Sequence, residues 1–179
     1  MVKKILIGLA AVILVLVIVV ALQPSEFRVS RTALIGAPPA TVFAQVNDFH
    51  KWNDWSPWAK IDPAAKYGFE GSASGVGAVF TWSGNNEVGE GRMTITASRS
   101  AEFVQYRLDF VKPFAATSTA EFALESKGEQ TQVTWTMYGK NDFLSKAVSL
   151  VVNCDKMLGG YFEKGLAQLD AVAKAETKK

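Results

Sequence analysis

The chain has 179 residues, which is enough for one globular domain plus an accessory segment. With 49% hydrophobic and 20% charged residues, its composition excludes a chain that is disordered as a whole. Its formal net charge of +2 equals the charge of Lys3 and Lys4, so the rest is neutral, and nucleic acid is not an expected partner because that binding depends on neutralising phosphates. A single cysteine, Cys154, excludes an intramolecular disulfide, and a single histidine, His50, excludes histidine-based triads and multi-histidine metal sites.

The N-terminal segment is a candidate membrane span. Ile5 to Leu22 is an uncharged, almost wholly aliphatic run, which as a helix is about 27 Å long. Because Lys3 and Lys4 precede it, the positive-inside rule places the N-terminus in the cytoplasm and the rest of this single-pass protein in the periplasm or outside the cell. We therefore expect a transmembrane anchor over residues 1–23 and a domain over residues 24–179. The alternative is a cleaved signal peptide, with Val19-Val20-Ala21 as its cleavage site.

The elements that follow are one strand, a short helix and six more strands. Phe27 to Ile35 is rich in β-forming residues, and Pro39 opens a helix of about ten residues. An aromatic-rich segment, Phe49 to Trp58, comes next. Short turn signals then separate the β-rich runs, so successive strands should pair as an antiparallel meander. These runs are Tyr67–Glu70, Gly77–Trp82, Gly89–Ser98, Glu102–Phe110, Ala115–Glu125 and Gln130–Tyr138.

A long amphipathic helix is expected to end the chain, with Asn141 or Asp142 as its N-cap. Gly159 and Gly160 lie in its middle, where each costs about 1 kcal/mol relative to alanine, so we expect either a bend or a neighbour that packs very close. Its apolar stripe is expected to comprise Phe143, Ala147, Val151, Cys154, Leu158, Tyr161, Leu166, Leu169 and Val172.

Four short motifs connect this element order to a known family. They are Ala37-Pro38-Pro39-Ala40-Thr41-Val42-Phe43, Trp52-Asn53-Asp54-Trp55-Ser56-Pro57-Trp58, Pro113-Phe114 and Val133-Thr134-Trp135-Thr136-Met137-Tyr138-Gly139. From Phe27 to Val172 the chain resembles the START-like domains of the SRPBCC superfamily, and within it the polyketide cyclase/dehydrase and lipid-transport-like proteins. The resemblance implies an α+β helix-grip fold, in which a curved seven-stranded antiparallel sheet wraps around a long C-terminal helix and a cavity. It implies no particular reaction, because fold does not determine function.

Strand alternation predicts which side chains face that cavity. Tyr106 and Leu108 should point inward from one strand, together with side chains of three neighbouring strands and of the long helix. The tryptophans of Phe49 to Trp58 are expected over the cavity mouth. The predicted ligand-binding residues are Trp55, Trp58, Met93, Tyr106, Leu108, Phe122, Trp135, Met137, Met157 and Tyr161. This lining is apolar with a few polar tips, as in small-molecule pockets, and the alternative is a filled core that the indoles close off.

No residue pattern predicts catalysis, a metal site or a cofactor. Glu90, Arg92 and Glu121 are the best acid–base candidates, but none has an identifiable partner in the sequence. Three interpretations concern other polar residues: a solvated surface His50, a packed core thiol at Cys154, and solvent-facing Asn153 and Asp155. The sequence thus favours a membrane-tethered binding or carrier domain for a lipid or other apolar small molecule. A cyclase-like or hydrolase-like enzyme and a tethered protein-interaction domain without a ligand are the alternatives.

Overall fold

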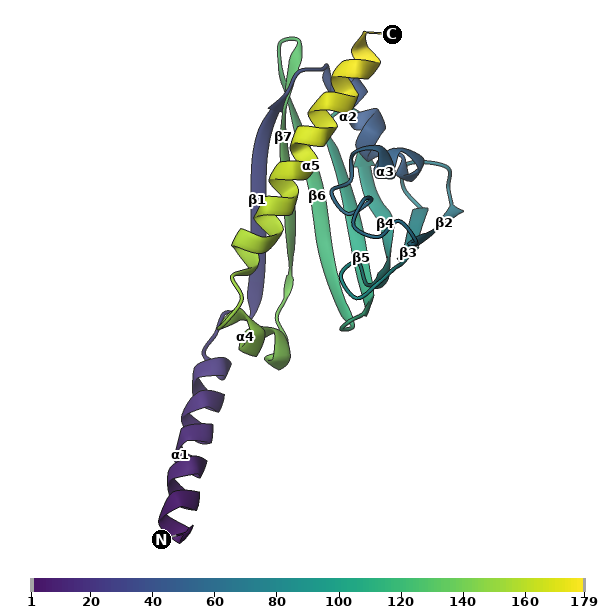
Figure 1. The fold of residues 1–179 in the computed structure, drawn as a ribbon. Helices are drawn as coiled ribbons and strands as arrows, with labels where there is room; N and C mark the ends of the chain where they lie inside the picture. Colours follow the sequence, from purple (N-terminus) through teal and green to yellow (C-terminus); the bar gives the residue numbers. More distant parts are fainter. Residues whose placement is uncertain (1, 179) are drawn as a thin grey trace.

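The computed structural model describes residues 2–178 as a rod-like helix followed by a sheet that a long helix crosses (Figure 1). The seven expected strands are present, each within two residues of its expected bounds. The elements in chain order are α1 (Val2–Ala21), β1 (Glu26–Ile35), α2 (Pro39–Val46), the 3₁₀ turn η1 (Phe49–Lys51), α3 (Trp52–Trp55), β2 (Lys66–Gly71), β3 (Ala78–Ser83), β4 (Glu90–Arg99), β5 (Phe103–Lys112), β6 (Ala116–Lys127), β7 (Gln130–Lys140), α4 (Phe143–Ser149) and α5 (Cys154–Thr177).

The sheet is a meander that the first strand completes. Strands β2 to β7 pair in succession and β1 adds to β7, so the order is β1-β7-β6-β5-β4-β3-β2 with every pair antiparallel. The pairing of β1 with β7 runs from Glu26 opposite Lys140 to Ile35 opposite Thr131. Together with α5 lying across the curved sheet, this topology confirms the α+β helix-grip fold (Figure 1).

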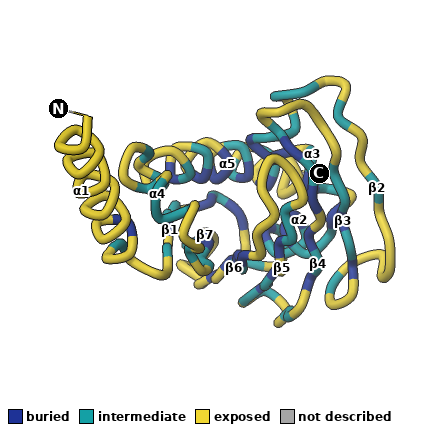
Figure 2. Tube along the Cα trace, turned by 90° about the horizontal axis from the view of Figure 1, so that it is seen from below, coloured by how far each residue is buried: buried dark blue, intermediate teal, exposed yellow. Residues whose placement is uncertain are grey.

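The core lies between the sheet and the helices α2, α3 and α5. Inward residues of the central strands, such as Val104, Tyr106 and Phe122, are fully buried, as alternation predicts. Figure 2 shows α5 lying along the inside of the curved sheet, with buried residues in both. Helix α5 packs through one stripe, which comprises Gly159, Phe162, Gly165, Leu166, Leu169 and Ala173.

Of the two expectations for the glycine pair, close packing is the one observed. A Cβ on Gly159 would lie 1.9 Å from Nη2 of Arg31, whereas one on Gly160 would meet nothing within 4 Å. Helix α5 runs unbroken through both residues. The absence of a side chain at Gly159 therefore lets α5 approach β1.

The expectation of a single C-terminal helix is wrong, because the chain forms two helices with separate caps. Asp142 caps α4 by accepting a hydrogen bond from the backbone N–H of Ser145 at 2.7 Å, and Asn153 caps α5 in the same way through Lys156 at 2.8 Å. The break resets the helical phase. Phe143 and Val151, expected on the buried stripe, are 56% and 85% exposed.

Helix α1 is the one helix within residues 2–178 that is long and apolar enough to cross a membrane, with a mean hydropathy of 3.1. Its side chains are exposed except for that of Val20. It contacts α4, and Nζ of Lys146 donates a hydrogen bond to the carbonyl of Ala21 at 3.3 Å. The apolar segment is therefore not part of the domain's core.

Candidate ligand-binding site

A cavity of about 250 Å³ lies between the concave face of the sheet and the helices α3 and α5. Strands β2 to β7 contribute one wall, α5 and the segment around α3 contribute the opposite wall, and loops form the rim. The lining residues are Trp52, Asn53, Ser56, Trp58, Ala59, Tyr67, Phe80, Trp82, Glu87, Val88, Met93, Tyr106, Leu108, Phe110, Lys112, Pro113, Ala120, Trp135, Met137, Leu158 and Phe162. Most are apolar, and the volume is slightly below the usual range for small-molecule pockets, about 300–1,000 Å³.

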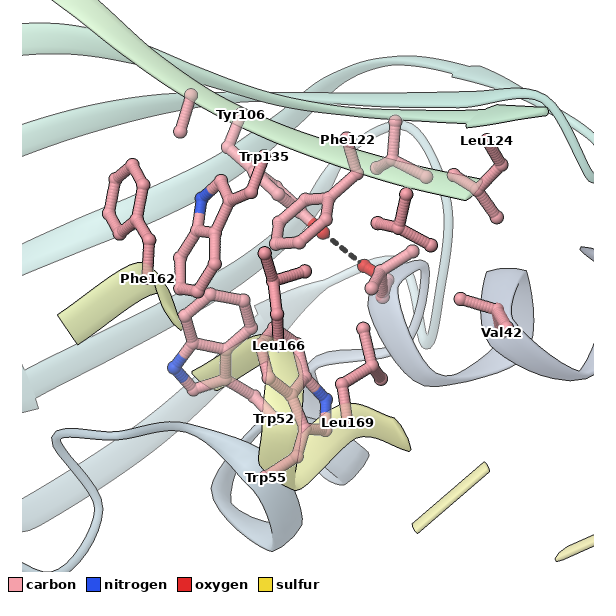
Figure 3. Close-up of a cluster of buried hydrophobic side chains, with 14 of the residues drawn as sticks. Val42, Trp52, Trp55, Tyr106, Phe122, Leu124, Trp135, Phe162, Leu166 and Leu169 are labelled. Carbon is pink, nitrogen blue, oxygen red and sulfur yellow. Dashed lines mark hydrogen bonds between the residues drawn. The ribbon is translucent and has the colours of Figure 1, made fainter. Parts of the chain in front are cut away.

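Trp135 is the centre of the aromatic cluster that forms the inner wall (Figure 3). Its ring stacks on Phe162 with centroids 4.2 Å apart and planes 7° apart, and on Phe122 at 4.8 Å. The rings of Trp52, Trp55 and Trp58 meet it edge-on at 5.7–6.2 Å. Offset stacking and edge-to-face packing thus surround the Trp135 ring on several sides.

Hydrogen bonds satisfy some of the polar tips around the cavity. The hydroxyl of Tyr106 donates to the carbonyl of Val46, and burial raises the pKa of this phenol well above its ordinary value, so it stays neutral. The indole N–H of Trp55 donates to Gln45, and that of Trp82 donates to Val88, each at 3.3 Å. These groups are therefore already engaged with the protein.

Two buried indole donors in the cavity wall lack a protein partner. Trp52 and Trp135 are 6% and 2% exposed, and within residues 2–178 neither Nε1–H has a hydrogen-bond acceptor. Within the same residues, Oε1 of Gln168 is the one side-chain nitrogen or oxygen atom that is both fully buried and without a hydrogen-bond partner. The two indole nitrogens are therefore still accessible from the cavity. In Figure 3 both nitrogens lie on the same side of the cluster as Phe162. A molecule in the cavity can thus accept hydrogen bonds from one or both.

Charged side chains and the β3–β4 loop, which accepts the hydrogen bond of the Trp82 indole, lie at the rim of the cavity. Nζ of Lys112 lies 2.7 Å from Oε2 of Glu90, and Glu87 is exposed on the β3–β4 loop. Gly91 allows Trp82 to lie across β4, because a Cβ there would be 2.6 Å from the indole ring and 2.7 Å from the carbonyl of Asp109. Trp82 in turn meets Phe110 edge-on at 5.8 Å. The charged side chains therefore lie at the mouth, whereas the interior is apolar.

The structure brings six of the ten predicted ligand-binding residues into the lining: Trp58, Met93, Tyr106, Leu108, Trp135 and Met137. Trp55 and Phe122 are fully buried behind the wall, and Tyr161 stacks on Trp58 with centroids 5.5 Å apart without lining the cavity.

The expectation that Met157 faces the sheet is wrong, because its side chain is 51% exposed. It precedes Gly159 by two residues, which is about 200° around a helix, and so lies opposite the buried stripe.

Sequence reasoning missed several lining residues that a fuller use of periodicity would have found. Phe80 and Trp82 alternate on β3 with the period of two that identified Tyr106 and Leu108 on β5. Leu158 and Phe162 are four residues apart on α5, as neighbours on one helix face are. The rim residues, including Glu87, Lys112 and Pro113, lie in or beside loops whose position depends on the folded sheet.

Asn153 and Asp155 are exposed, as expected, but both also make structural contacts. Asn153 is the N-cap of α5, and Asp155 accepts two hydrogen bonds from the guanidinium of Arg31, each at 3.0 Å. Nε of Arg31 also lies 2.8 Å from Glu163. The guanidinium holds the pKa of Asp155 below its ordinary value. This cluster fastens α5 to β1 on the outside of the domain.

The acid–base candidates have partners at the surface. Glu90, Arg92 and Glu121 form ion pairs, with Lys112, Glu70 and Arg28 respectively. His50 is exposed, as expected, and its ring stacks on Phe69 at 4.3 Å. Among the described residues, no three His, Cys, Asp or Glu side chains come together as a metal site requires.

An antiparallel sheet that grips a long C-terminal helix over an apolar cavity defines the helix-grip class of proteins. The chain belongs to the polyketide cyclase / dehydrase and lipid transport family, whose model matches residues 26–174. The resemblance to the SRPBCC superfamily is thereby confirmed.

Solved structures share the fold at low sequence identity. Protein CV1439 from Chromobacterium violaceum is 14% identical, with a TM-score of 0.59 over 84% of this chain and 97% of its own. The major latex-like protein 151 of Panax ginseng is also 14% identical, with a TM-score of 0.59 over 84% and 99%. The di-domain ARO/CYC StfQ of the steffimycin biosynthetic pathway is 9% identical, with a TM-score of 0.62 over 86% and 52%. No curated protein sequence matches the chain.

Proposed function

We propose that the domain binds a lipid or another apolar small molecule in this cavity, and that α1 tethers it to a membrane. The observation that carries the proposal is the apolar cavity whose wall presents the unpartnered indole N–H groups of Trp52 and Trp135. A small molecule that fills the space removes apolar wall from water, which is the dominant favourable term in such binding. The family description and the fold are consistent with this function.

The same two donors narrow the class of ligand. A ligand that fills the cavity removes water from these two N–H groups, and a buried N–H group without an acceptor is costly. A ligand that carries a carbonyl, ester or ether oxygen beside the indoles should therefore bind more tightly than a pure hydrocarbon. A charged group is better placed at the rim, where Lys112 and Glu87 are exposed. We therefore propose an apolar molecule with one or two neutral acceptors as the ligand.

The alternative of an enzyme gains no specific support from the site. Among titratable cavity residues, Tyr106 is engaged with the carbonyl of Val46, Tyr67 is exposed on β2, and Glu87 and Lys112 are exposed at the rim. A general acid or base needs a titratable group held beside the reacting atoms. We therefore propose a binding or carrier role.

A matched pair of variants tests the cavity. Ala120 lies on the cavity side of β6 and Ala123 is exposed on the opposite face of the same strand. Ala120→Leu fills part of the space and is expected to weaken uptake of the fluorescent probe N-phenylnaphthylamine several-fold, whereas Ala123→Leu leaves uptake unchanged. Mass spectrometry of organic extracts of the purified full chain is expected to detect a bound apolar molecule. Absence of both a copurified molecule and probe uptake in the parent would rule out the proposal.

Fusion reporters test the tether and its direction. A reporter that is active only outside the cytoplasm is expected to be active after Lys179, because Lys3 and Lys4 remain inside. Activity of a cytoplasm-only reporter at that position would reverse the orientation. A mature chain that lacks the N-terminal segment by mass would instead identify α1 as a signal peptide.

A further inference from the structure

Helix α4 carries its apolar face on the outside of the domain. Its apolar residues Phe143, Leu144, Ala147 and Val148 form one helical face, which Val151 continues in the turn after the helix, and its polar residues Ser145, Lys146 and Ser149 lie opposite. The side chains of Phe143, Leu144, Val148 and Val151 are 56%, 52%, 39% and 85% exposed. We call these four residues the α4 surface. In a helix of a water-soluble domain this face would normally pack on the core.

The α4 surface lies where α1 joins the domain (Figure 1). Lys146 donates to the carbonyl of Ala21, and Val20 is buried where α1 contacts α4. The backbone N–H of Asn141 donates to Ser25 at 2.8 Å and its side chain donates to Pro24 at 3.2 Å, so the short connection after α1 is fixed to the start of α4. At 20 residues α1 is about 30 Å long, the thickness of the hydrocarbon core of a bilayer. When α1 spans a membrane, its end at Ala21 therefore brings α4 to the headgroup layer.

A second exposed apolar group lies at the same end of the domain. Val111 near the end of β5 and Phe114 in the β5–β6 turn are 53% and 64% exposed, and between them lie the rim residues Lys112 and Pro113 (Figure 1). Exposed Lys140 lies two residues before Asp142, the N-cap of α4. Aromatic and aliphatic side chains flanked by lysines are typical of segments that lie in the interface of a membrane.

We infer that the α4 surface docks into the headgroup layer of the membrane that α1 enters, and that the cavity rim at the β5–β6 turn faces that membrane. This inference rests on the proposed tether but not on the proposed ligand. Because exposed apolar side chains leave water for the acyl boundary, the domain is held against the bilayer and does not swing freely on the residues after α1. A ligand then has a short path between bilayer and cavity.

Site-directed labels on the full chain test the docking. In a Cys154→Ser background, single cysteines replace Leu144 and Val151 on the α4 surface, Ala171 on the exposed side of α5 as a distant control, and Leu14 in α1 as a membrane control. Each is labelled with bimane, and the protein is placed in phosphatidylcholine nanodiscs with a minor share of phosphatidylglycerol, at one chain per disc to exclude a second copy. Bimane is then quenched by aqueous iodide or by lipids that carry a nitroxide near the headgroup.

Docking predicts that labels at positions 144 and 151 are protected from iodide several-fold relative to position 171 and are quenched by the shallow nitroxide lipid. Iodide access at 144 and 151 equal to that at 171, with position 14 protected, would overturn the docking and leave the tether intact. Access at position 14 as well would overturn both. Val151→Gln with the label at position 144 serves as a further variant, since weakened docking is expected to restore iodide access there without unfolding the chain.

Discussion

The contact between α5 and the inner wall of the cavity predicts different effects of alanine at two glycines on the same helix. Gly165 is buried, and a Cβ there would lie 2.7 Å from Cζ3 of Trp135 and 3.1 Å from Cδ of Pro57. Gly160 is exposed, and a Cβ there meets nothing within 4 Å. Alanine at either position gains about 1 kcal/mol from helix propensity. Only at Gly165 does the new methyl group overpack a ring that cannot move away easily.

Trp135 cannot yield cheaply because Phe122 and Phe162 stack on it at 4.8 and 4.2 Å. Overpacking of a filled core costs about 1–3 kcal/mol. Gly160→Ala is thus expected to stabilise the domain by about 1 kcal/mol. Gly165→Ala is expected to have a free energy of unfolding about 1–3 kcal/mol below that of Gly160→Ala, because the propensity term is common to both.

Urea unfolding of the full chain in a mild detergent, followed by tryptophan fluorescence, measures this difference, since all five tryptophans lie outside α1. Trp135→Phe in the Gly165→Ala background serves as the control, because a smaller ring makes room for the methyl group and should reduce the penalty of Gly165→Ala. Equal stabilisation by the two alanines would refute the reasoning and show that α5 does not press on Trp135.

Three further predictions concern other parts of the molecule. Tyr106→Phe leaves the carbonyl of Val46 without its donor and is expected to cost about 1–3 kcal/mol in the free energy of unfolding, measured in the same urea titration. Arg31 lowers the pKa of Asp155, so the contribution of this carboxylate to stability is complete above its ordinary pKa of 3.8 and is lost as pH falls through the lowered pKa. When the free energy of unfolding is measured at decreasing pH, Asp155→Asn should lose less stability in that window than the parent. The same acid profile for variant and parent would argue against the contact. Deletion of residues 1–22 is expected to leave a soluble domain that unfolds cooperatively, because Val20 is the one described residue of α1 whose side chain is buried. Loss of cooperative unfolding would show that α1 is part of the folded domain.

Periodicity predicts the sheet well because its strands obey a strict alternation. The set of Tyr106, Phe122 and Trp135 follows from that alternation, and all three are buried. The short separators between runs also predict hairpins, and thereby the meander. What strand patterns cannot supply is the position of the β3–β4 and β5–β6 loops, which form the rim only after the sheet curves.

The C-terminal region shows where a helical pattern misleads. Phe143, Ala147, Val151, Cys154 and Leu158 continue at three- and four-residue spacing across the break, so periodicity alone gives no sign of two helices. The one local signal was Asn153, a good N-cap residue in the middle of the run. Apolar spacing also does not distinguish a helical face that packs on the core from one that stays exposed, and so it predicts a buried Phe143 where the side chain is 56% exposed.

The pairing of β1 with β7 constrains the order in which the sheet can assemble. β1 follows α1 directly and is the first strand to be synthesised, yet its one partner is the last strand, from Glu26 opposite Lys140 to Ile35 opposite Thr131. Until β7 has emerged, the backbone donors and acceptors of β1 have no native strand to bind, and such an unpaired edge invites wrong pairing. A chaperone that binds the unpaired β1 segment would thus be needed mainly between the synthesis of β1 and that of β7. Synonymous codons that slow translation across β2 to β6 would lengthen the time for which β1 stays unpaired.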